Sequence, residues 1–271
     1  MAQAYSRNPA LSRRMNRFFR RAAPTPELVA KAYANFRPGY PPGLFAWLAS
    51  VVAARDAVWD CGCGSGQASV PLAEHFSTVC ATDVAVEQIA AAKPHPRVTY
   101  TVAPAEHSGL PGGSVDLVTV AQALHWFDVD AFYAEAHRVA RPDAIIAIWT
   151  YPRPRFVDEQ LDAVFLEFYT KVVGPYWPPE RRHIEANYTT LPFPFREMEH
   201  PEFGFDLDWS FEQVLGYVSS WSATVRYRQA LDRDPVPLLQ ETLGPVWPGA
   251  GVTARLRMPL GLRVAKIRSA L

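Results

Sequence analysis

Three glycines spaced two residues apart, with an aspartate on either side, form the segment of this chain best suited to hold a ligand. Gly62, Gly64 and Gly66 follow a short apolar run and precede a helical pattern. Because glycine has no Cβ, such a loop turns tightly and lets a ligand approach its backbone. Asp60 precedes Gly62 by two positions, and Asp83 ends the next apolar run. Parallel strands end at one edge of a sheet, where open α/β folds bind ligands, so we expect both carboxylates beside the loop.

Two classes of ligand compete for this loop. A nicotinamide or flavin dinucleotide requires Gly-x-Gly-x-x-Gly, with its pyrophosphate on the helix N-terminus. Here Gln67 stands where the third glycine belongs, and the Asp60 carboxylate would repel a pyrophosphate. A ligand with a cationic amino group, an adenosine and no phosphate fits better; S-adenosylmethionine is such a ligand, and Asp83 would receive its ribose hydroxyls. The alternative without a ligand is a tight turn in which Asp83 caps the next helix.

The segment Asp60–Gly66 resembles motif I of the class I S-adenosylmethionine-dependent methyltransferases. Further matches follow along the chain, namely Asp83, Ala105–Glu106, Ser114–Val118 and the more specific Ala121–Asp128. Together with Tyr33, Phe36–Pro41, Leu191–Phe195 and Ser220–Ala223, they resemble the branch of trans-aconitate methyltransferase-like and plant embryo-abundant-type proteins, the type 11 methyltransferases. The resemblance covers about residues 30–267.

The resemblance implies roles for the matching residues. Asp60 and the Gly62–Gly66 backbone would hold the methionine part of the cofactor, and Asp83 its ribose. The other implied cofactor contacts are Val84 beside the adenine, Ala105 and Glu106 along the adenine edge, Gln122 and Ala123 at the methionyl end, and Tyr33, Arg37 and Tyr40 closing the pocket, with Arg37 near the cofactor carboxylate. The implied reaction transfers a methyl group to an oxygen or nitrogen of a small-molecule acceptor and leaves S-adenosylhomocysteine.

His125 is the candidate general base, because an imidazole pKa of about 6.5 suits proton removal at neutral pH. The alternative is that His125 and Trp126 only pack at the lip of the sheet. Residues 149–227 hold 18 of the 34 aromatic residues, which indicates a cap over the acceptor. The wall candidates are Tyr40, Trp126, Tyr176, Trp177, Phe193, Phe195 and Trp221, and the candidate carboxylate ligands are Arg153, Arg155, Arg181 and Arg182. Alternatively, the aromatic residues build a core and the arginines are solvated.

Short apolar runs alternate with helical segments, which predicts an α/β fold. The resemblance adds that the sheet is Rossmann-like, seven-stranded and mostly parallel, with helices on both faces and a substrate cap inserted after strand 5. Strands are predicted at Ala57–Cys61, Thr78–Asp83, Val98–Ala103, Val115–Ala121, Ala144–Thr150, Glu202–Trp209 and, as a strand or hairpin, Val252–Ile267. Helices are predicted at Glu27–Phe36, from Pro42 to Ala54, and at Gln67–Phe76, Val86–Ala92, Val129–Ala140, Asp158–Val172 and Phe211–Trp221.

We divide the chain into three parts: a basic tail (residues 1–23), a cofactor-binding core with N-terminal helices (24–151), and a substrate cap with the strands that complete the sheet (152–271). Residues 152–201 contain eight prolines, which marks the change of texture. The tail has six arginines and no acidic residue, as organelle-targeting peptides do. A frayed tail, or a helix lying over the domain, is the simpler interpretation.

The composition excludes several classes of protein. With 27 basic and 27 acidic residues the chain has no net charge, which argues against a nucleic-acid partner. No apolar run approaches the roughly 18 residues of a membrane span. Three cysteines, Cys61, Cys63 and Cys80, favour a reduced, cytoplasmic setting over disulfides. No second Cys/His cluster supports a metal at Cys61 and Cys63, so no metal is expected.

One turn departs from the family pattern. Residues 140–144 read Ala-Arg-Pro-Asp-Ala, where the family carries Leu-Lys-Pro-Gly-Gly. We expect this change to alter the turn rather than the cofactor site. Two other functions stay open, a nucleotide-dependent oxidoreductase on a Rossmann sheet and a non-catalytic cofactor-binding partner protein. The sequence leaves the acceptor and the oligomeric state undetermined.

Overall fold

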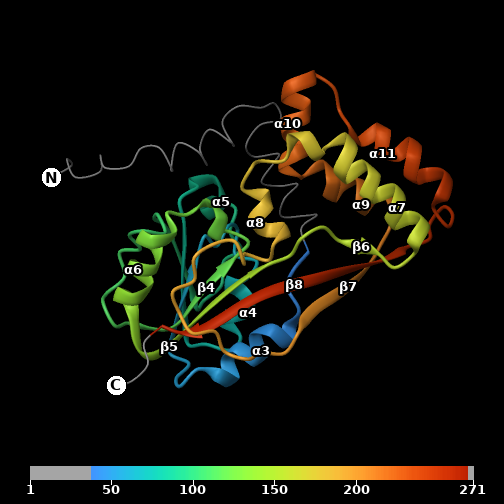
Figure 1. Ribbon diagram of the computed structural model, residues 1–271. Helices are drawn as coiled ribbons and strands as arrows, with labels where there is room; N and C mark the ends of the chain where they lie inside the picture. Colours follow the sequence, from blue (N-terminus) through green and yellow to red (C-terminus); the bar gives the residue numbers. More distant parts are fainter. Residues whose placement is uncertain (1–37, 268–271) are drawn as a thin grey trace.

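The computed structural model describes residues 38–267. Tyr33, Arg37, the helix predicted at Glu27–Phe36 and the basic tail lie outside the described residues. Within them, a central sheet carries helices on both faces, and further helices form a cap beyond one end of the sheet (Figure 1). The predicted α/β fold class is confirmed.

The sheet is parallel over its first five strands, in the order β3-β2-β1-β4-β5. The next strand, β8, is antiparallel and pairs with β5, β6 and β7. The two-residue β6 makes the described sheet eight-stranded, where the prediction had seven. The strands are β1 Ala57–Cys61, β2 Thr78–Asp83, β3 Val98–Val102, β4 Val115–Ala121, β5 Ala140–Thr150, β6 Arg155–Phe156, β7 Phe203–Trp209 and β8 Ala254–Lys266.

The central strands are buried on both faces, as the continuous apolar runs predict. In β1 the neighbours Val58 and Trp59 point to opposite faces and belong to two different core clusters. One cluster is covered by helices α3 (Pro42–Val51) and α4 (Ser69–Ala73), and the other by α6 (Val129–Val139). Helix α5 (Val86–Ala90) follows β2 and buries no residue fully. Helix α4 is half as long as predicted, because it begins two residues later, after a turn at Gln67–Ala68, and ends three residues earlier, at Ala73.

The turn before β5 corrects one prediction. The sequence predicts a helix that ends at Ala140 and a strand that begins at Ala144, with Pro142 between them, but α6 ends at Val139 and β5 begins directly at Ala140. Pro142 therefore lies inside the strand, where the register with β4 shifts. Asp143 adopts a left-handed φ of 60° and accepts a hydrogen bond from Lys266 at 3.0 Å. This turn is at the N-terminal end of β5, the edge opposite the glycine loop, so the departure from the family pattern does not reach the loop.

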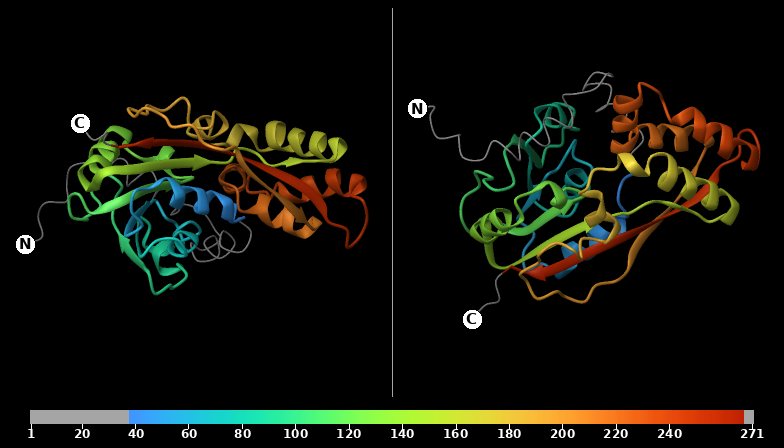
Figure 2. Two further views of the ribbon diagram at one scale, coloured as in Figure 1. Left: turned by 90° about the horizontal axis from the view of Figure 1, so that it is seen from below. Right: turned by 45° about the horizontal axis from the view of Figure 1, so that its top comes forward.

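The cap has a hydrophobic core of its own and is continuous with the sheet through β8. Figure 2 shows its helices beyond the end of the sheet core. The cap elements are α7 Glu159–Glu167 with the π-helical turn η2 Phe168–Val172, η3 Gly174–Tyr176, α8 Arg181–Glu185, α9 Phe211–Ser219, α10 Ser222–Leu231, α11 Val236–Leu243 and η4 Gly244–Val246. The C-terminal half of β8 pairs with β5 and its N-terminal half with β7, so the last element is one long strand and not a hairpin. A capping box starts α9, as its sequence predicts.

A strained connection follows α8. Asn187 and Tyr188 both have left-handed φ angles, 49° and 61°, which non-glycine residues rarely adopt. The Asn187 side chain lies over Gly261 of β8, where a Cβ would approach the Asn187 Oδ1 to 2.4 Å. Gly261 therefore leaves the space that this connection needs.

We expect Gly261→Ala to lower the free energy of unfolding by about 1–3 kcal/mol, the usual cost of an added methyl in a filled space. Adding Asn187→Gly removes the opposing side chain and should restore most of that loss. Urea denaturation of both variants measures it. Gly43→Ala is the control, because nothing lies within 4 Å of its Cβ position. If Gly261→Ala is as stable as Gly43→Ala, the contact does not constrain the connection.

Candidate active site

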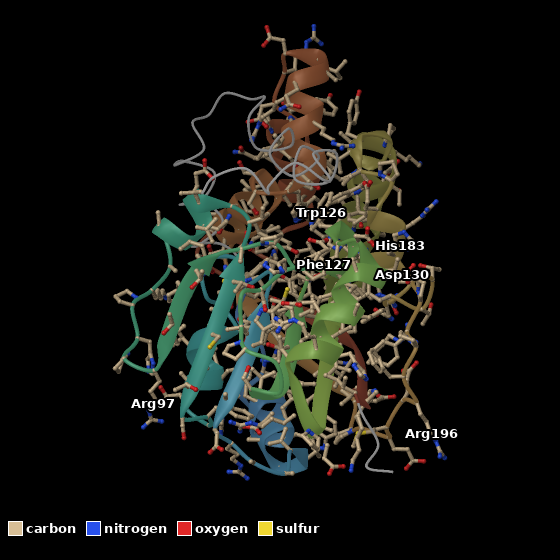
Figure 3. All side chains as sticks on the ribbon, turned by 90° about the vertical axis from the view of Figure 1, so that its left-hand side faces the viewer. Arg97, Trp126, Phe127, Asp130, His183 and Arg196 are labelled. Carbon is tan, nitrogen blue, oxygen red and sulfur yellow. The ribbon has the colours of Figure 1, made fainter. Side chains whose placement is uncertain are left out.

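The candidate site lies at the carboxyl edge of the parallel strands. In Figure 3, Trp126 and Phe127 lie at the edge of the sheet beneath the cap, and Arg97, which precedes β3, lies at the opposite edge. The loops after β1, β2 and β4 meet at the first edge. The sheet thus brings together three groups of predicted site residues, which lie at 60–66, 83–84 and 122–125.

Glycine is required in the loop after β1 because neighbouring side chains fill the space of a Cβ. Gly62 has a φ of 67°, and its Cβ would lie 2.5 Å from the Ala123 Cβ. Gly66 has a φ of 89°, and its Cβ would lie 2.2 Å from the Tyr100 hydroxyl. A side chain at either position would displace the loop from the segment after β4 or from β3.

The loop amides bond to the protein itself. The amides of Gly62 and Cys63 donate to the Thr82 carbonyl at 2.8 and 3.0 Å. The Gly64 amide donates to the Asp83 carboxylate at 2.9 Å. A phosphate cradle instead needs these donors free to face the ligand. This loop lacks that property, which argues against a pyrophosphate.

Two buried carboxylates support the loop. Asp60 is fully buried beneath it and accepts hydrogen bonds from the hydroxyls of Ser69 and Thr119, at 2.6 and 2.9 Å. Burial raises the pKa of Asp60 to about 6. Asp83 accepts from the amides of Gly64 and Ala85, and burial raises the pKa of its carboxyl as well. The Val84 backbone contributes a further bond, and because the two oxygens of a carboxylate offer about four acceptor positions in all, Asp83 retains capacity for another donor.

A pocket opens between the glycine loop and the segment that precedes α3. It is lined by Pro38, Tyr40, Gly62, Cys63, Gly64, Gln67, Ala68, Ala121 and Tyr151. Tyr40, predicted to close the pocket, lies in this wall. Near it, the buried Gln88 Oε1 has no hydrogen-bond partner among residues 38–267 and lies 3.8 Å from the position of a Gly64 Cβ. Sequence reasoning missed Gln88, because one glutamine on a short helix belongs to no motif that would indicate a ligand contact.

The remaining predicted cofactor contacts lie around this edge with partners of their own. Ala105 is buried in the core, and the neighbouring Glu106 accepts a hydrogen bond from the Asp128 amide at 2.9 Å. Val84 is half-buried next to Asp83. Gln122 has a left-handed φ of 60°, and its side chain accepts from the Thr150 hydroxyl and donates to the Tyr151 carbonyl. Ala123 packs against Gly62.

His125 faces Tyr188. Its Nδ1 lies 2.8 Å from the Tyr188 hydroxyl, and the two rings stack. Burial, with a smaller contribution from Arg181, lowers the pKa of His125 to about 3. His125 is therefore neutral at physiological pH and a weaker base than expected. Sequence reasoning missed Tyr188, which comes from the strained connection 63 residues further along the chain.

The structure separates the aromatic wall candidates. Trp221 is buried inside the cap core, so it is not a wall residue. Phe193 and Phe195 pack on Tyr133 of α6. Tyr176 packs on Tyr227, and Trp126 packs on His125. Trp177 is half-buried and contacts Arg181, which lies 4.6 Å from its ring centroid.

The four arginines also differ. Arg153 is buried and forms a bidentate ion pair with Asp162. Arg155 and Arg182 are exposed. Arg181 alone among these four lies near His125.

Other chemistries find little support among residues 38–267. Burial raises the pKa of the Cys61 and Cys63 thiols far above their ordinary range, so both stay protonated. These residues contain no cluster of three or more His, Cys, Asp or Glu side chains able to hold a metal ion. None of their helices is both long and apolar enough to cross a bilayer.

Comparison with known proteins points to one family. A family model described as a methyltransferase domain matches residues 59–148. A Dictyostelium discoideum protein named as a methyltransferase is 35% identical over 79% of this chain and 83% of its own length. A Saccharomyces cerevisiae protein named as an S-adenosylmethionine-dependent methyltransferase is 29% identical over 58% of each chain.

A solved structure supports the same family. The structure of a protein described as a type II methyltransferase from Anaeromyxobacter dehalogenans superposes with a TM-score of 0.81, at 46% identity, over 87% of this chain and all of that one. The trans-aconitate and plant branch is not singled out by these matches. The strand order, the glycine loop with Asp83, and these relatives together show that the chain belongs to the class I S-adenosylmethionine-dependent methyltransferases.

Proposed function

We propose that this chain binds S-adenosylmethionine and transfers its methyl group to an oxygen or nitrogen of a small-molecule acceptor. The observation that carries the proposal is the use of the Gly62, Cys63 and Gly64 amides within the protein, beside two carboxylates. Such a loop suits a cationic ligand without phosphate. The same observation disfavours a nucleotide-dependent oxidoreductase. Membership of the trans-aconitate and plant branch stays a prediction from the motifs.

The residues present fit the cofactor. The Gly62–Gly66 backbone would hold its methionine part, with the buried Asp60 supporting that loop from beneath, and Gln122 and Ala123 would lie at the methionyl end. Asp83 retains acceptor capacity for a ribose hydroxyl, and the unpartnered Gln88 Oε1 supplies a further acceptor beside Gly64. The remaining contacts would be Val84, Ala105 and Glu106 for the adenine, Tyr40 in the pocket wall, and Tyr33 and Arg37. When bound, the cofactor supplies a methyl group on a sulfonium sulfur.

The protein contributes placement and exclusion of water. The cap and the carboxyl edge of the sheet enclose the acceptor between them, and His125 and Tyr188 lie on the acceptor side of that edge. Because His125 is neutral, it can form a hydrogen bond with the nucleophile without repelling the sulfonium charge. We keep His125 as the candidate that takes the acceptor proton. A non-catalytic cofactor-binding protein would need no such arrangement.

We expect S-adenosylhomocysteine to raise the thermal unfolding midpoint by several degrees, because ligand at 100 times its Kd adds about 2.7 kcal/mol of stability. NAD should leave the midpoint unchanged. Asp83→Ala should abolish the shift, since the ribose loses its acceptor. Asp56→Ala is the control, because Asp56 is exposed at the opposite edge of the sheet. A shift with NAD instead, or an unchanged shift in Asp83→Ala, would contradict the proposal.

We expect Gly62→Ala to weaken S-adenosylhomocysteine binding at least 10-fold, because the new Cβ would overlap Ala123 and displace the loop. Gly109→Ala is matched to it, with a similar left-handed φ of 76° but nothing within 4 Å. Both variants incur backbone strain, and only the first should lose affinity in calorimetry. Equal affinities would mean that the close packing of the loop is unimportant for binding.

The protonation of His125 can be tested through stability. As the pH falls from 7 to 5, the unfolded chain protonates this histidine at about 6.5, while the folded chain does so only near 3. The wild type should therefore lose about 1–2 kcal/mol more stability over this range than His125→Gln, measured by urea unfolding. Parallel curves would show an ordinary pKa, and His125 would then be a stronger base than its burial indicates.

A further inference from the structure

Arg181 is a largely buried cation that uses only one of its nitrogens. Its side chain is 16% exposed. Its Nε donates to Glu185 at 2.7 Å and to the Tyr169 hydroxyl at 2.9 Å. Within residues 38–267, its two terminal amino groups have no hydrogen-bond partner. Up to four N–H donors of a planar fork are thus available to a ligand.

Other arginines buried to a similar degree use these groups. Arg153 is 9% exposed and directs both terminal nitrogens at Asp162. Arg263 is 14% exposed, and its terminal nitrogens bond to Glu197 and to two backbone carbonyls. A structural role explains those two arginines fully. In Arg181 it explains only the Nε contacts, which fix the guanidinium in place.

A second unpartnered donor belongs to the same cluster. The Arg181 guanidinium carbon lies 4.6 Å from the ring centroid of Trp177 and 5.8 Å from that of Tyr169. The Trp177 Nε1 is buried and has no partner among the described residues. Indole N–H and guanidinium groups only donate hydrogen bonds. Donors of both kinds at one place suit a group that only accepts hydrogen bonds.

The cluster lies on the acceptor side of the candidate active site. Helix α8, which carries Arg181, packs against the turn η1 Leu124–Trp126 that follows β4. Arg181 is close enough to depress the pKa of His125. The Gly62 position contacts Ala123, two residues before His125. The turn η1, which carries His125, therefore lies between the glycine loop and helix α8 with Arg181.

We propose that Arg181 and Trp177 form an anion subsite that binds a carboxylate of the methyl acceptor. The inference rests on the proposed function, because it names the chemistry of that acceptor. A guanidinium fork matches the two oxygens of a carboxylate. Because Arg181 is already ion-paired with Glu185, the subsite offers hydrogen-bond donors rather than net positive charge, which suits a monoanion better than a doubly charged phosphate. The flat rings of Trp177 and Tyr169 provide apolar surface for the body that bears the carboxylate.

The test compares acids with their amides. Acetate, benzoate and phenylacetate are titrated by calorimetry into the full-length protein, with and without saturating S-adenosylhomocysteine, and each is compared with its neutral amide. We expect at least one acid to bind 10-fold or more tightly than its amide. Arg181→Gln should remove that preference, and Trp177→Phe, which keeps the ring and removes the N–H, should weaken it 3-fold or more. Arg182→Gln, an exposed neighbour, should leave it unchanged.

Several outcomes would overturn the subsite. These are no acid preferred over its amide, a preference that survives in Arg181→Gln, or a phenyl phosphate that binds more tightly than benzoate. Circular dichroism and S-adenosylhomocysteine affinity of Arg181→Gln should match the wild type, which excludes misfolding. If the wild type fails to bind S-adenosylhomocysteine, the proposed function fails, while the titrations without it still test the subsite. If it binds S-adenosylhomocysteine but shows no acid preference, only the subsite is wrong.

Discussion

The buried carboxylate of Asp83 is the point on which the cofactor site depends. It joins two loops by accepting the Gly64 amide at 2.9 Å and the Ala85 amide at 2.8 Å. Removing either donor would leave a buried charge with one fewer hydrogen bond, which is costly. The same bond withdraws an amide that a phosphate would need. A contact inside the protein therefore limits the class of ligand that the loop can accept.

The strand β8 connects the cofactor side of the edge with the acceptor side. Gly261 pairs with Thr150 of β5, whose hydroxyl donates to Gln122 beside the glycine loop. Because Gly261 has no side chain, Asn187 can pack against it. Asn187 directly precedes Tyr188, so this contact also positions the Tyr188 hydroxyl that faces His125. The cost of two consecutive left-handed residues is tolerated only where the surroundings over-determine them, as they do at functional sites.

The sequence predicts most of the sheet, because parallel strands buried on both faces leave continuous apolar runs. β1, β2 and β4 have the predicted bounds. The predicted break between Ala140 and Ala144 is wrong, because the shifted register with β4 accommodates Pro142 inside the strand. In the site, the motif residues come together as predicted, whereas no signal in the sequence indicates that Tyr188 and Gln88 belong to it. Their roles arise from contacts across the fold and leave no local pattern.

The aromatic excess of the cap also needed the structure to be interpreted. The cap joins the sheet core through long strands, so it needs a hydrophobic core of its own. Trp221 and Phe165 pack against each other in that core. Sequence alone gave the four cap arginines equal standing. Burial distinguishes them, because desolvating a cation is costly unless its donors are satisfied. Arg153 meets that cost with Asp162, and exposed Arg182 avoids it. Arg181 is largely buried and is paired with Glu185 through its Nε alone, so an anionic ligand would add the hydrogen bonds that its terminal N–H groups do not make to residues 38–267.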